Sequence, residues 1–246
     1  MQIHITLSSN RDIVLPMHYN HMMQAFIYQN ISPDLADFLH TKGYEADGRI
    51  FKLFTFSRFK AKFYLDKDTK TVTYTPPITC TISSPVDEFC KSFAEHLLQS
   101  DTLFLGDNEV WVEQIQIDKP TIQEKSIVVI ANSPVIAYST LLKPEGGKYT
   151  CYFMPREPNY NEMITQNLKK KYKALTGEDF GEGLVTVEPL GQPKLCVVYY
   201  KKTVIKGCIG KFRIRGDEKL LKVGIEAGFG SKNSQGFGCV KLLERR

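Results

Sequence analysis

The distribution of apolar residues along the first third of the chain predicts a strand followed by a helix. Residues 1–9 alternate apolar and polar side chains, with Ile3, Ile5 and Leu7 on one face, which is typical of a half-buried strand. Residues 22–31 (MMQAFIYQNI) instead place their apolar side chains roughly along one stripe at helical spacing. The hydrophobic period therefore changes from two to about 3.6 within the first thirty residues.

A second helix is predicted over residues 33–43 (PDLADFLHTKG). Ser32 can cap its N-terminus, Pro33 suits its first turn, and Gly43 ends it. The rest of the first half consists of strand regions within 49–66, 71–84 and 110–118 and an amphipathic helix over 84–101. The aromatic region 49–66 is expected to form one or two strands, and Pro76-Pro77 interrupts the region 71–84.

The second half of the chain repeats this order. Its predicted elements are strands within 126–140, 148–154, 194–216 and 236–244 and helices over 161–177 and 217–228. An order of β, α, β, β, α, β in each half indicates ferredoxin-like units. The sequence therefore predicts an α+β fold of two tandem ferredoxin-like domains, 1–120 and 121–246, with the boundary near 115–125. Such sheets often bind single-stranded RNA when their surfaces are basic, although fold alone does not determine function.

Composition narrows the class of protein. A chain of 246 residues that is 42% hydrophobic is long enough for one large domain or two small ones. The six cysteines form no Cys-x-x-Cys pair, which gives a zinc site little support, and most stand in apolar runs as buried thiols do. No signal peptide and no run of 18 apolar residues is recognisable, so we expect a protein of the reducing cytoplasm with no membrane span.

Charge is spread unevenly along the chain. From Lys194 to the end there are 13 Lys and Arg against 4 Asp and Glu, whereas the preceding residues carry 19 basic and 23 acidic side chains. This asymmetry favours a polyanionic partner for the C-terminal part. An ordinary solvated surface rich in lysine is the alternative.

The segment 227–243 (AGFGSKNSQGFGCVKLL) is the most distinctive motif. Its glycines and polar residues that could contact a phosphate are Gly228, Gly230, Lys232, Asn233, Gly236 and Gly238. Glycine-rich loops can point backbone N–H groups at phosphate oxygens. The spacing matches neither the Walker loop nor the dinucleotide fingerprint, so a classical nucleotide-binding loop is excluded. The alternative is a plain turn between two packed elements.

The motifs that are missing also narrow the chemistry. No His-rich or acidic metal-binding motif is visible, so we expect no metal and no cofactor if the chain is an enzyme. RNA carries its own nucleophile, the 2′-hydroxyl, and a ribonuclease without metal needs a proton acceptor, a proton donor and a cation for the phosphate.

Tyr28, His40 and Lys52 are candidates for these three roles. For each the alternative is structural: a half-buried core tyrosine, a histidine interacting with helix-terminal carbonyls, and a lysine on an edge strand. His4, His18, His21 and His96 are weaker candidates, and His21 is the best of them because it opens the same helix as Tyr28.

These motifs together resemble a known family. The segments LPMHYNHMMQAFIYQNI, FLHTKGY, FKLFTFSRF and AGFGSKNSQGFGCVKLL are similar to the CRISPR-associated endoribonuclease family numbered six, within the repeat-associated mysterious protein superfamily. The resemblance spans the whole chain and rests on residues 15–59 and 224–243. It implies an endoribonuclease that cleaves precursor CRISPR RNA inside each repeat, leaving 2′,3′-cyclic phosphate and 5′-hydroxyl ends.

The resemblance also implies roles for the three residues: Tyr28 as general base, His40 as general acid and Lys52 as phosphate stabiliser. Because free tyrosine has a pKa near ~10, Tyr28 as an orienting group with His40 carrying the proton is the alternative. Nearby basic residues expected to hold repeat phosphates are Lys206, Lys211, Arg213 and Arg215.

The expected partner is CRISPR repeat RNA. The runner-up function is an RNA-binding subunit that holds repeat RNA without cutting it. A nucleotide or small-molecule enzyme is weakly supported, because no complete nucleotide-binding loop is present. The sequence leaves open a homodimer and association with an interference complex of other CRISPR-associated proteins.

Overall fold

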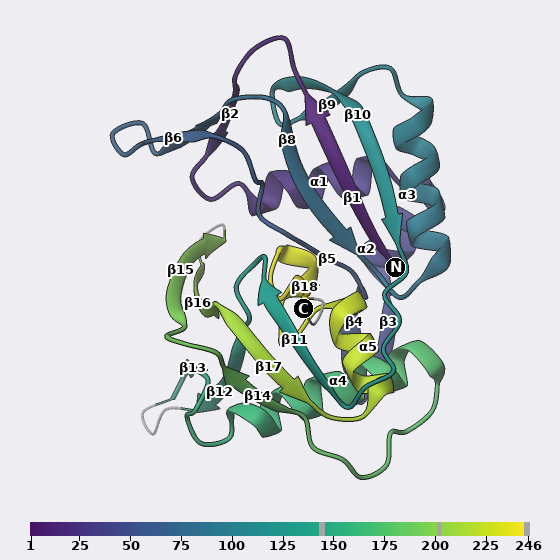
Figure 1. Cartoon of the computed structure of the whole chain (residues 1–246), viewed down its shortest axis with the longest axis vertical. Coiled ribbons are helices and arrows are strands. Elements are labelled where there is room, and N and C mark those ends of the chain that lie inside the picture. The colour runs from purple at the N-terminus through teal and green to yellow at the C-terminus, as the bar shows by residue number, and fades with distance from the viewer. Residues whose placement is uncertain (143–145, 201–202, 244–246) are drawn as a thin grey trace.

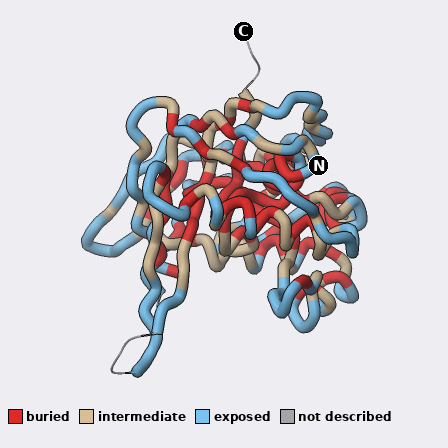
Figure 2. The backbone as a smooth tube through the Cα atoms, turned by 90° about the horizontal axis from the view of Figure 1, so that it is seen from below, coloured by how far each residue is buried: buried red, intermediate tan, exposed pale blue. Residues whose placement is uncertain are grey.

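Two antiparallel sheets, each packed against helices, form the two halves of the molecule (Figure 1). The structure is a computed structural model and describes residues 1–142, 146–200 and 203–243. Buried backbone is concentrated in the interior and exposed segments lie at the periphery (Figure 2). Among the described residues, no helix is long and apolar enough to cross a membrane.

The N-terminal sheet has the strand order β5-β8-β1-β10-β9. Its elements are β1 (Gln2–Ser8), β5 (Thr55–Phe56), β8 (Ile78–Ser83), β9 (Leu103–Leu105) and β10 (Asn108–Asp118), with helices α1 (Asn20–Gln29), α2 (Pro33–Thr41) and α3 (Asp87–Gln99). Smaller sheets flank it: β2 (Ile13–Pro16), β7 (Thr71–Tyr74) and β6 (Phe63–Asp66) form one, and β3 (Tyr44–Ala46) pairs with β4 (Arg49–Phe51).

The C-terminal sheet has the order β14-β17-β11-β18. Its elements are β11 (Ser126–Ala131), β14 (Thr186–Pro189), β17 (Lys211–Arg215) and β18 (Val240–Leu242), with helices α4 (Tyr160–Thr176) and α5 (Glu218–Ala227) and the short 3₁₀ helix η1 (Asn233–Gln235). Two hairpins extend from it, β12 (Ala137–Leu142) with β13 (Lys148–Phe153) and β15 (Lys194–Tyr200) with β16 (Thr203–Ile209).

Each half follows the β-α-β-β-α-β order with its first and third principal strands at the centre of the sheet, β1 beside β8 and β11 beside β17. This arrangement confirms the predicted α+β fold of two ferredoxin-like domains. The predicted boundary at residue 120 lies in the connection 119–125 between β10 and β11 and stays a prediction.

The region 49–66 differs from its prediction. It was expected to form one or two strands, but it contains three short ones, β4, β5 and β6. The reason lies at Leu53, whose φ of 53° breaks the extended backbone. Leu53 packs into the C-terminal core, whereas Phe54 packs into the N-terminal core. The apolar residues of this region therefore pack into two different cores, because the chain runs between them.

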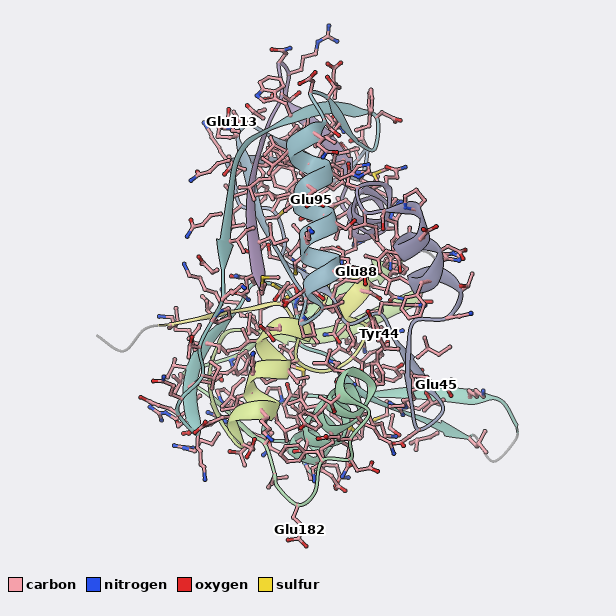
Figure 3. The ribbon with its side chains drawn as sticks, turned by 90° about the vertical axis from the view of Figure 1, so that its right-hand side faces the viewer. Tyr44, Glu45, Glu88, Glu95, Glu113 and Glu182 are labelled. Atoms are coloured by element: carbon pink, nitrogen blue, oxygen red, sulfur yellow. The ribbon has the colours of Figure 1, made fainter. Side chains whose placement is uncertain are left out.

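Tyr44 shows how the two cores meet. Its ring packs against buried residues of both cores and contacts Phe38 edge to face, with ring centroids 5.2 Å apart. In Figure 3 Tyr44 lies near Glu88, at the level where the two halves join. Burial and the charge of Glu88 raise the pKa of the Tyr44 phenol. The cores are therefore joined through a shared aromatic contact.

Candidate functional site

The turn after α2 places Lys52 beside the end of that helix. Gly43 adopts a left-handed conformation (φ 69°) and donates its N–H to Phe38 O at 2.7 Å. A Cβ at this position would lie 2.8 Å from Phe51 O, so only glycine fits without rearrangement. After the β3–β4 hairpin the chain reaches Lys52, whose Nζ donates to the backbone oxygen of His40 at 3.3 Å. Two of the three predicted catalytic residues are thus neighbours.

Tyr28 approaches the same segment from α1. Its ring contacts the Phe54 ring edge to face, with centroids 5.9 Å apart, and Phe54 lies two residues after Lys52. Leu53, between Lys52 and Phe54 in the sequence, is a non-glycine residue with positive φ. Such a backbone conformation costs conformational energy and is enriched at functional sites. With this backbone conformation, Phe54 packs into the N-terminal core, whereas Lys52 contacts the backbone oxygen of His40.

The environments of the three side chains differ. Tyr28 is half-buried, and burial together with Tyr200 raises the pKa of its phenol to about 12. His40 is exposed, and burial lowers the pKa of Lys52 below its ordinary value. At neutral pH the Tyr28 phenol is therefore uncharged, which makes it a weak proton acceptor and a good hydrogen-bond donor.

The glycine-rich segment is held in shape by close backbone approaches. A Cβ on Gly230 would lie 2.2 Å from Ile136 O, and one on Gly238 would lie 2.0 Å from Phe229 O. At Gly236 the obstruction comes from the N-terminal domain, because a Cβ there would lie 2.4 Å from Phe56. Glycine at these positions therefore lets the segment fold tightly and dock against the other domain.

Polar side chains of the N-terminal domain fix this docking. Asn20 Nδ2 donates to Gln235 O at 2.7 Å, and Thr55 Oγ1 donates to Phe237 O at 2.8 Å. Asn20 is the first residue of α1, and Thr55 lies three residues after Lys52. These two bonds therefore hold the glycine-rich segment against α1 and against the segment that contains Lys52. The predicted catalytic region and the predicted loop, separated by some 180 residues, thus lie side by side.

Asn233 and Lys171 hold the segment from within. Asn233 is buried, and its Nδ2 donates to Phe229 O at 3.2 Å and Phe237 O at 2.9 Å. Lys171 of α4 is 2% exposed, and its Nζ donates to Gly228 O at 2.6 Å and Gly230 O at 2.8 Å. The Asn233 amide therefore closes the turn, and Lys171 binds carbonyls beyond the C-terminal end of α5.

Sequence reasoning missed Lys171. It stands third in a run of three lysines that is typical of a solvated helix face. The overlooked signal is spacing, because Ile164, Leu168 and Lys171 recur at intervals of four and three and share the buried face of α4. Burial lowers the pKa of Lys171 well below that of a free lysine.

A cavity of about 940 Å³ lies between the domains. Its walls are residues 49–54, residues 136–140, one face of α4 and residues 230–235 of the glycine-rich segment. Lys52 and Lys232 both line it. Lys232 has a left-handed backbone (φ 61°), its Nζ lies 5.3 Å from the centre of the Tyr138 ring, and burial lowers its pKa.

The predicted site residues divide between this cavity and other places. Those that line the cavity are Lys52, Gly230, Lys232 and Asn233. Tyr28 and His40 do not line it, but the Tyr28 ring contacts Phe54 and the backbone oxygen of His40 accepts from Lys52, and both Phe54 and Lys52 line the cavity. Among the described residues, no group of three or more His, Cys, Asp and Glu side chains could hold a metal ion.

The four predicted basic residues lie elsewhere. Lys211, Arg213 and Arg215 alternate along β17 with buried residues that face α4 and α5, so they project from the opposite face of the sheet. Arg213 and Arg215 share Glu188 at 3.6 and 3.0 Å, while Lys206 is exposed on the β15–β16 hairpin. They were expected near the glycine-rich segment, but α4 and the sheet separate three of them from the cavity.

A second, smaller hollow of about 230 Å³ lies over the polar face of the N-terminal sheet. Lys60 and Lys241 line it together with His4. His4 contacts Thr81 Oγ1 at 2.8 Å through Nδ1 and Asp118 Oδ2 at 3.0 Å through Nε2. Both imidazole nitrogens of His4 are therefore already engaged.

Two family models match the chain. The model described as CRISPR-associated protein Cas6, N-terminal, matches residues 14–116, and CRISPR associated protein Cas6, C-terminal, matches residues 117–242. Together they account for nearly all of the described structure.

Individual relatives agree with the models. The chain is 30% identical to CRISPR-associated endoribonuclease Cas6 1 of Methanocaldococcus jannaschii, over 99% of this chain and 93% of that protein. It is 28% identical to CRISPR-associated endoribonuclease Cas6 of Pyrococcus furiosus, over 95% of this chain and 85% of that protein. A solved structure described as CRISPR associated protein Cas6 superposes with a TM-score of 0.79 at 27% identity, covering 99% of both chains.

Proposed function

Because the chain belongs to the Cas6 family of CRISPR-associated proteins, we propose that it is an endoribonuclease that cleaves precursor CRISPR RNA within its repeats. The observation that carries this proposal is the position of Lys52. Its ammonium donates to the backbone oxygen of His40 near the end of α2, and Lys52 lines an inter-domain cavity that the glycine-rich segment also lines. We propose that the scissile phosphate binds Lys52, with the imidazole of His40 and the phenol of Tyr28 supplied by the adjacent helices α2 and α1.

The proposed reaction is attack of the 2′-hydroxyl on the adjacent phosphorus. The 2′-oxygen to phosphorus bond forms, the phosphorus to 5′-oxygen bond breaks, and the products are a 2′,3′-cyclic phosphate and a 5′-hydroxyl. Lys52 stabilises the additional negative charge on the phosphate oxygens in the transition state. This chemistry uses the internal nucleophile of RNA, so we propose that the reaction requires no metal.

Proton transfer is assigned to His40. The neutral imidazole accepts the proton of the 2′-hydroxyl, and the resulting imidazolium protonates the departing 5′-oxygen, so protons balance over the turnover. Tyr28 stays a neutral phenol, because its pKa is raised to about 12, and orients the 2′-hydroxyl through a hydrogen bond. Of the two roles expected for Tyr28, the raised pKa supports orientation over general base.

The RNA is held on both sides of the cut. Lys232 and the backbone of the glycine-rich segment contact the strand within the cavity, while the exposed Lys206 and Lys211 supply phosphate contacts elsewhere. Charged contacts of this kind release counterions, so affinity is expected to fall as salt concentration rises.

The decisive experiment is incubation with a matched repeat RNA in excess chelator. Cleavage at a single position, with product ends that resist ligation until the cyclic phosphate is removed, is the expected result. A deoxyribose placed immediately upstream of the cut is expected to abolish cleavage while leaving binding intact. Cutting that persists at the deoxyribose would exclude attack by the 2′-hydroxyl.

The same assay addresses the runner-up function. Tight binding of repeat RNA with no product under any condition, including added divalent cations, would mean that the protein holds repeat RNA without processing it. Cleavage that occurs only with divalent cations would retain the endoribonuclease and reject the metal-independent mechanism.

A further inference from the structure

Asn167 is buried without a hydrogen-bond partner. It lies on α4, is 7% exposed, and its Oδ1 has no partner among the described residues. Its Nδ2 also has no hydrogen bond within the described chain, but this atom is not fully buried. An unpaired buried carbonyl oxygen such as Oδ1 opposes folding, because it loses its bonds to water and gains none in return. Such a group needs an explanation outside the folded chain itself.

The position of Asn167 supplies that explanation. The residue lines the inter-domain cavity, as Lys52 does. The second buried oxygen without a partner in the described chain, Gln235 Oε1, belongs to a residue that lines the same cavity from the glycine-rich segment. The two residues that carry unsatisfied acceptors therefore border one cavity, on elements from different parts of the sequence.

The cavity has the size and charge for a nucleotide. Its volume of about 940 Å³ is at the upper end of the range for small-molecule sites. Four basic residues besides the buried Lys171 line it, namely Arg49, Lys52, Lys170 and Lys232, against a single acidic one, Glu162. Positive charge favours a phosphate-bearing ligand, and orphan oxygen acceptors favour a ligand that also carries N–H donors.

We propose that Asn167, assisted by Gln235, is a specificity-determining residue that reads the exocyclic amino group of an adenine or a cytosine. The inference rests on the proposed function, because the nucleobase belongs to the RNA whose phosphate lies at Lys52. A terminal amide turns about χ2 over a broad energy minimum, and no hydrogen bond of Asn167 has to break for it to turn toward the cavity. Paired donor and acceptor atoms on an asparagine match the edge of adenine, and its oxygen alone accepts from cytosine.

The principal variant is Asn167→Leu, which keeps the shape of the side chain and removes its hydrogen-bonding atoms. The substrates are the parent repeat RNA and a series in which single adenines or cytosines near the cut are replaced by purine or 2-pyrimidinone, which lack the amino group. At one position the wild-type protein is expected to lose about 10- to 100-fold in kcat/KM when the amino group is removed. The Asn167→Leu variant is expected to cleave both RNAs at nearly equal rates.

Stability separates this role from a structural one. If Asn167 is unpaired in the free protein, Asn167→Leu has a melting temperature equal to or above that of wild type, because an orphan polar group is removed. Asn10→Leu, on an exposed residue after β1, is the matched control and leaves both stability and discrimination unchanged. Gln235→Leu is expected to weaken the same discrimination at the same nucleotide.

The outcomes are distinguishable. The inference is overturned if Asn167→Leu discriminates among the RNAs as wild type does, or if it melts well below wild type. Failure of the wild-type protein to cut any repeat RNA would instead reject the proposed function. In that case dissociation constants for the same RNA series, measured with wild type and Asn167→Leu, still test whether Asn167 reads a base.

Discussion

Replacing Lys171 with methionine tests how the glycine-rich segment is held. Methionine keeps an unbranched chain of similar length and removes only the amino group, so the substitution leaves little new cavity. Two carbonyl oxygens, of Gly228 and Gly230, lose donors at 2.6 and 2.8 Å. Both glycines are buried, so water does not readily replace the lost bonds.

The expected loss of stability follows from these contacts. Each buried carbonyl left without a donor costs about 1–3 kcal/mol, which places the gross loss at about 2–6 kcal/mol. Part of this is offset because the amine no longer has to be removed from water, as the lowered pKa of Lys171 indicates. We expect a net decrease of about 2–4 kcal/mol in the free energy of unfolding, with a melting temperature lower by on the order of 10 °C.

Urea denaturation and calorimetry of wild type and Lys171→Met measure this difference. Lys222→Met makes the same chemical change on an exposed residue of α5 and is expected to leave stability within about 0.5 kcal/mol of wild type. If Lys171→Met is as stable as Lys222→Met, the buried contacts of the Lys171 amine contribute nothing net and the reasoning fails.

The same residue predicts a pH dependence. Because burial lowers the pKa of Lys171 in the folded protein, the unfolded chain binds more protons between that value and the ordinary lysine value. The contribution of Lys171 to the free energy of unfolding therefore rises with pH across this window. The stability difference between wild type and Lys171→Met is expected to widen as the pH is raised toward ~10; a constant difference would contradict the lowered pKa.

Three further predictions concern the proposed reaction. His40→Ala is expected to cut repeat RNA far more slowly and to bind it nearly as well, whereas His21→Ala keeps its activity; parallel loss of binding and cutting would mark His40 as structural. Lys52→Ala should lower kcat by about 10²-fold or more in single-turnover assays, through loss of one charge stabiliser, and a near-normal rate would remove Lys52 from the mechanism. Because the pKa of Tyr28 is about 12, its phenolate fraction rises tenfold per pH unit throughout the range 8–10; we expect no such rise in the cleavage rate, and a tenfold rise that Tyr28→Phe abolishes would restore Tyr28 as general base.

Much of the fold and part of the site were predictable from local pattern. The alternation around Ile3 and Ile5, the helix terminated by the turn at Gly43, and the glycines of the last loop depend on neighbouring residues. Local backbone preferences therefore determine them whatever the tertiary surroundings. The region 49–66 is the exception. Its aromatic alternation indicated extended strands, but positive φ at Leu53 lets consecutive residues enter different cores.

What the sequence by itself determined is the repeated βαββαβ pattern and the glycine-rich segment, and it also led to the proposal of Tyr28, His40 and Lys52 as the catalytic set. Tertiary structure decided which polar groups are buried and what they contact. Lys171 in a lysine run binds loop carbonyls, Arg213 pairs with Glu188 away from the cavity, and Asn167 is buried without a partner. Periodicity is set by near neighbours, whereas burial and pairing depend on surfaces brought together from distant parts of the chain, so only the folded molecule reveals them.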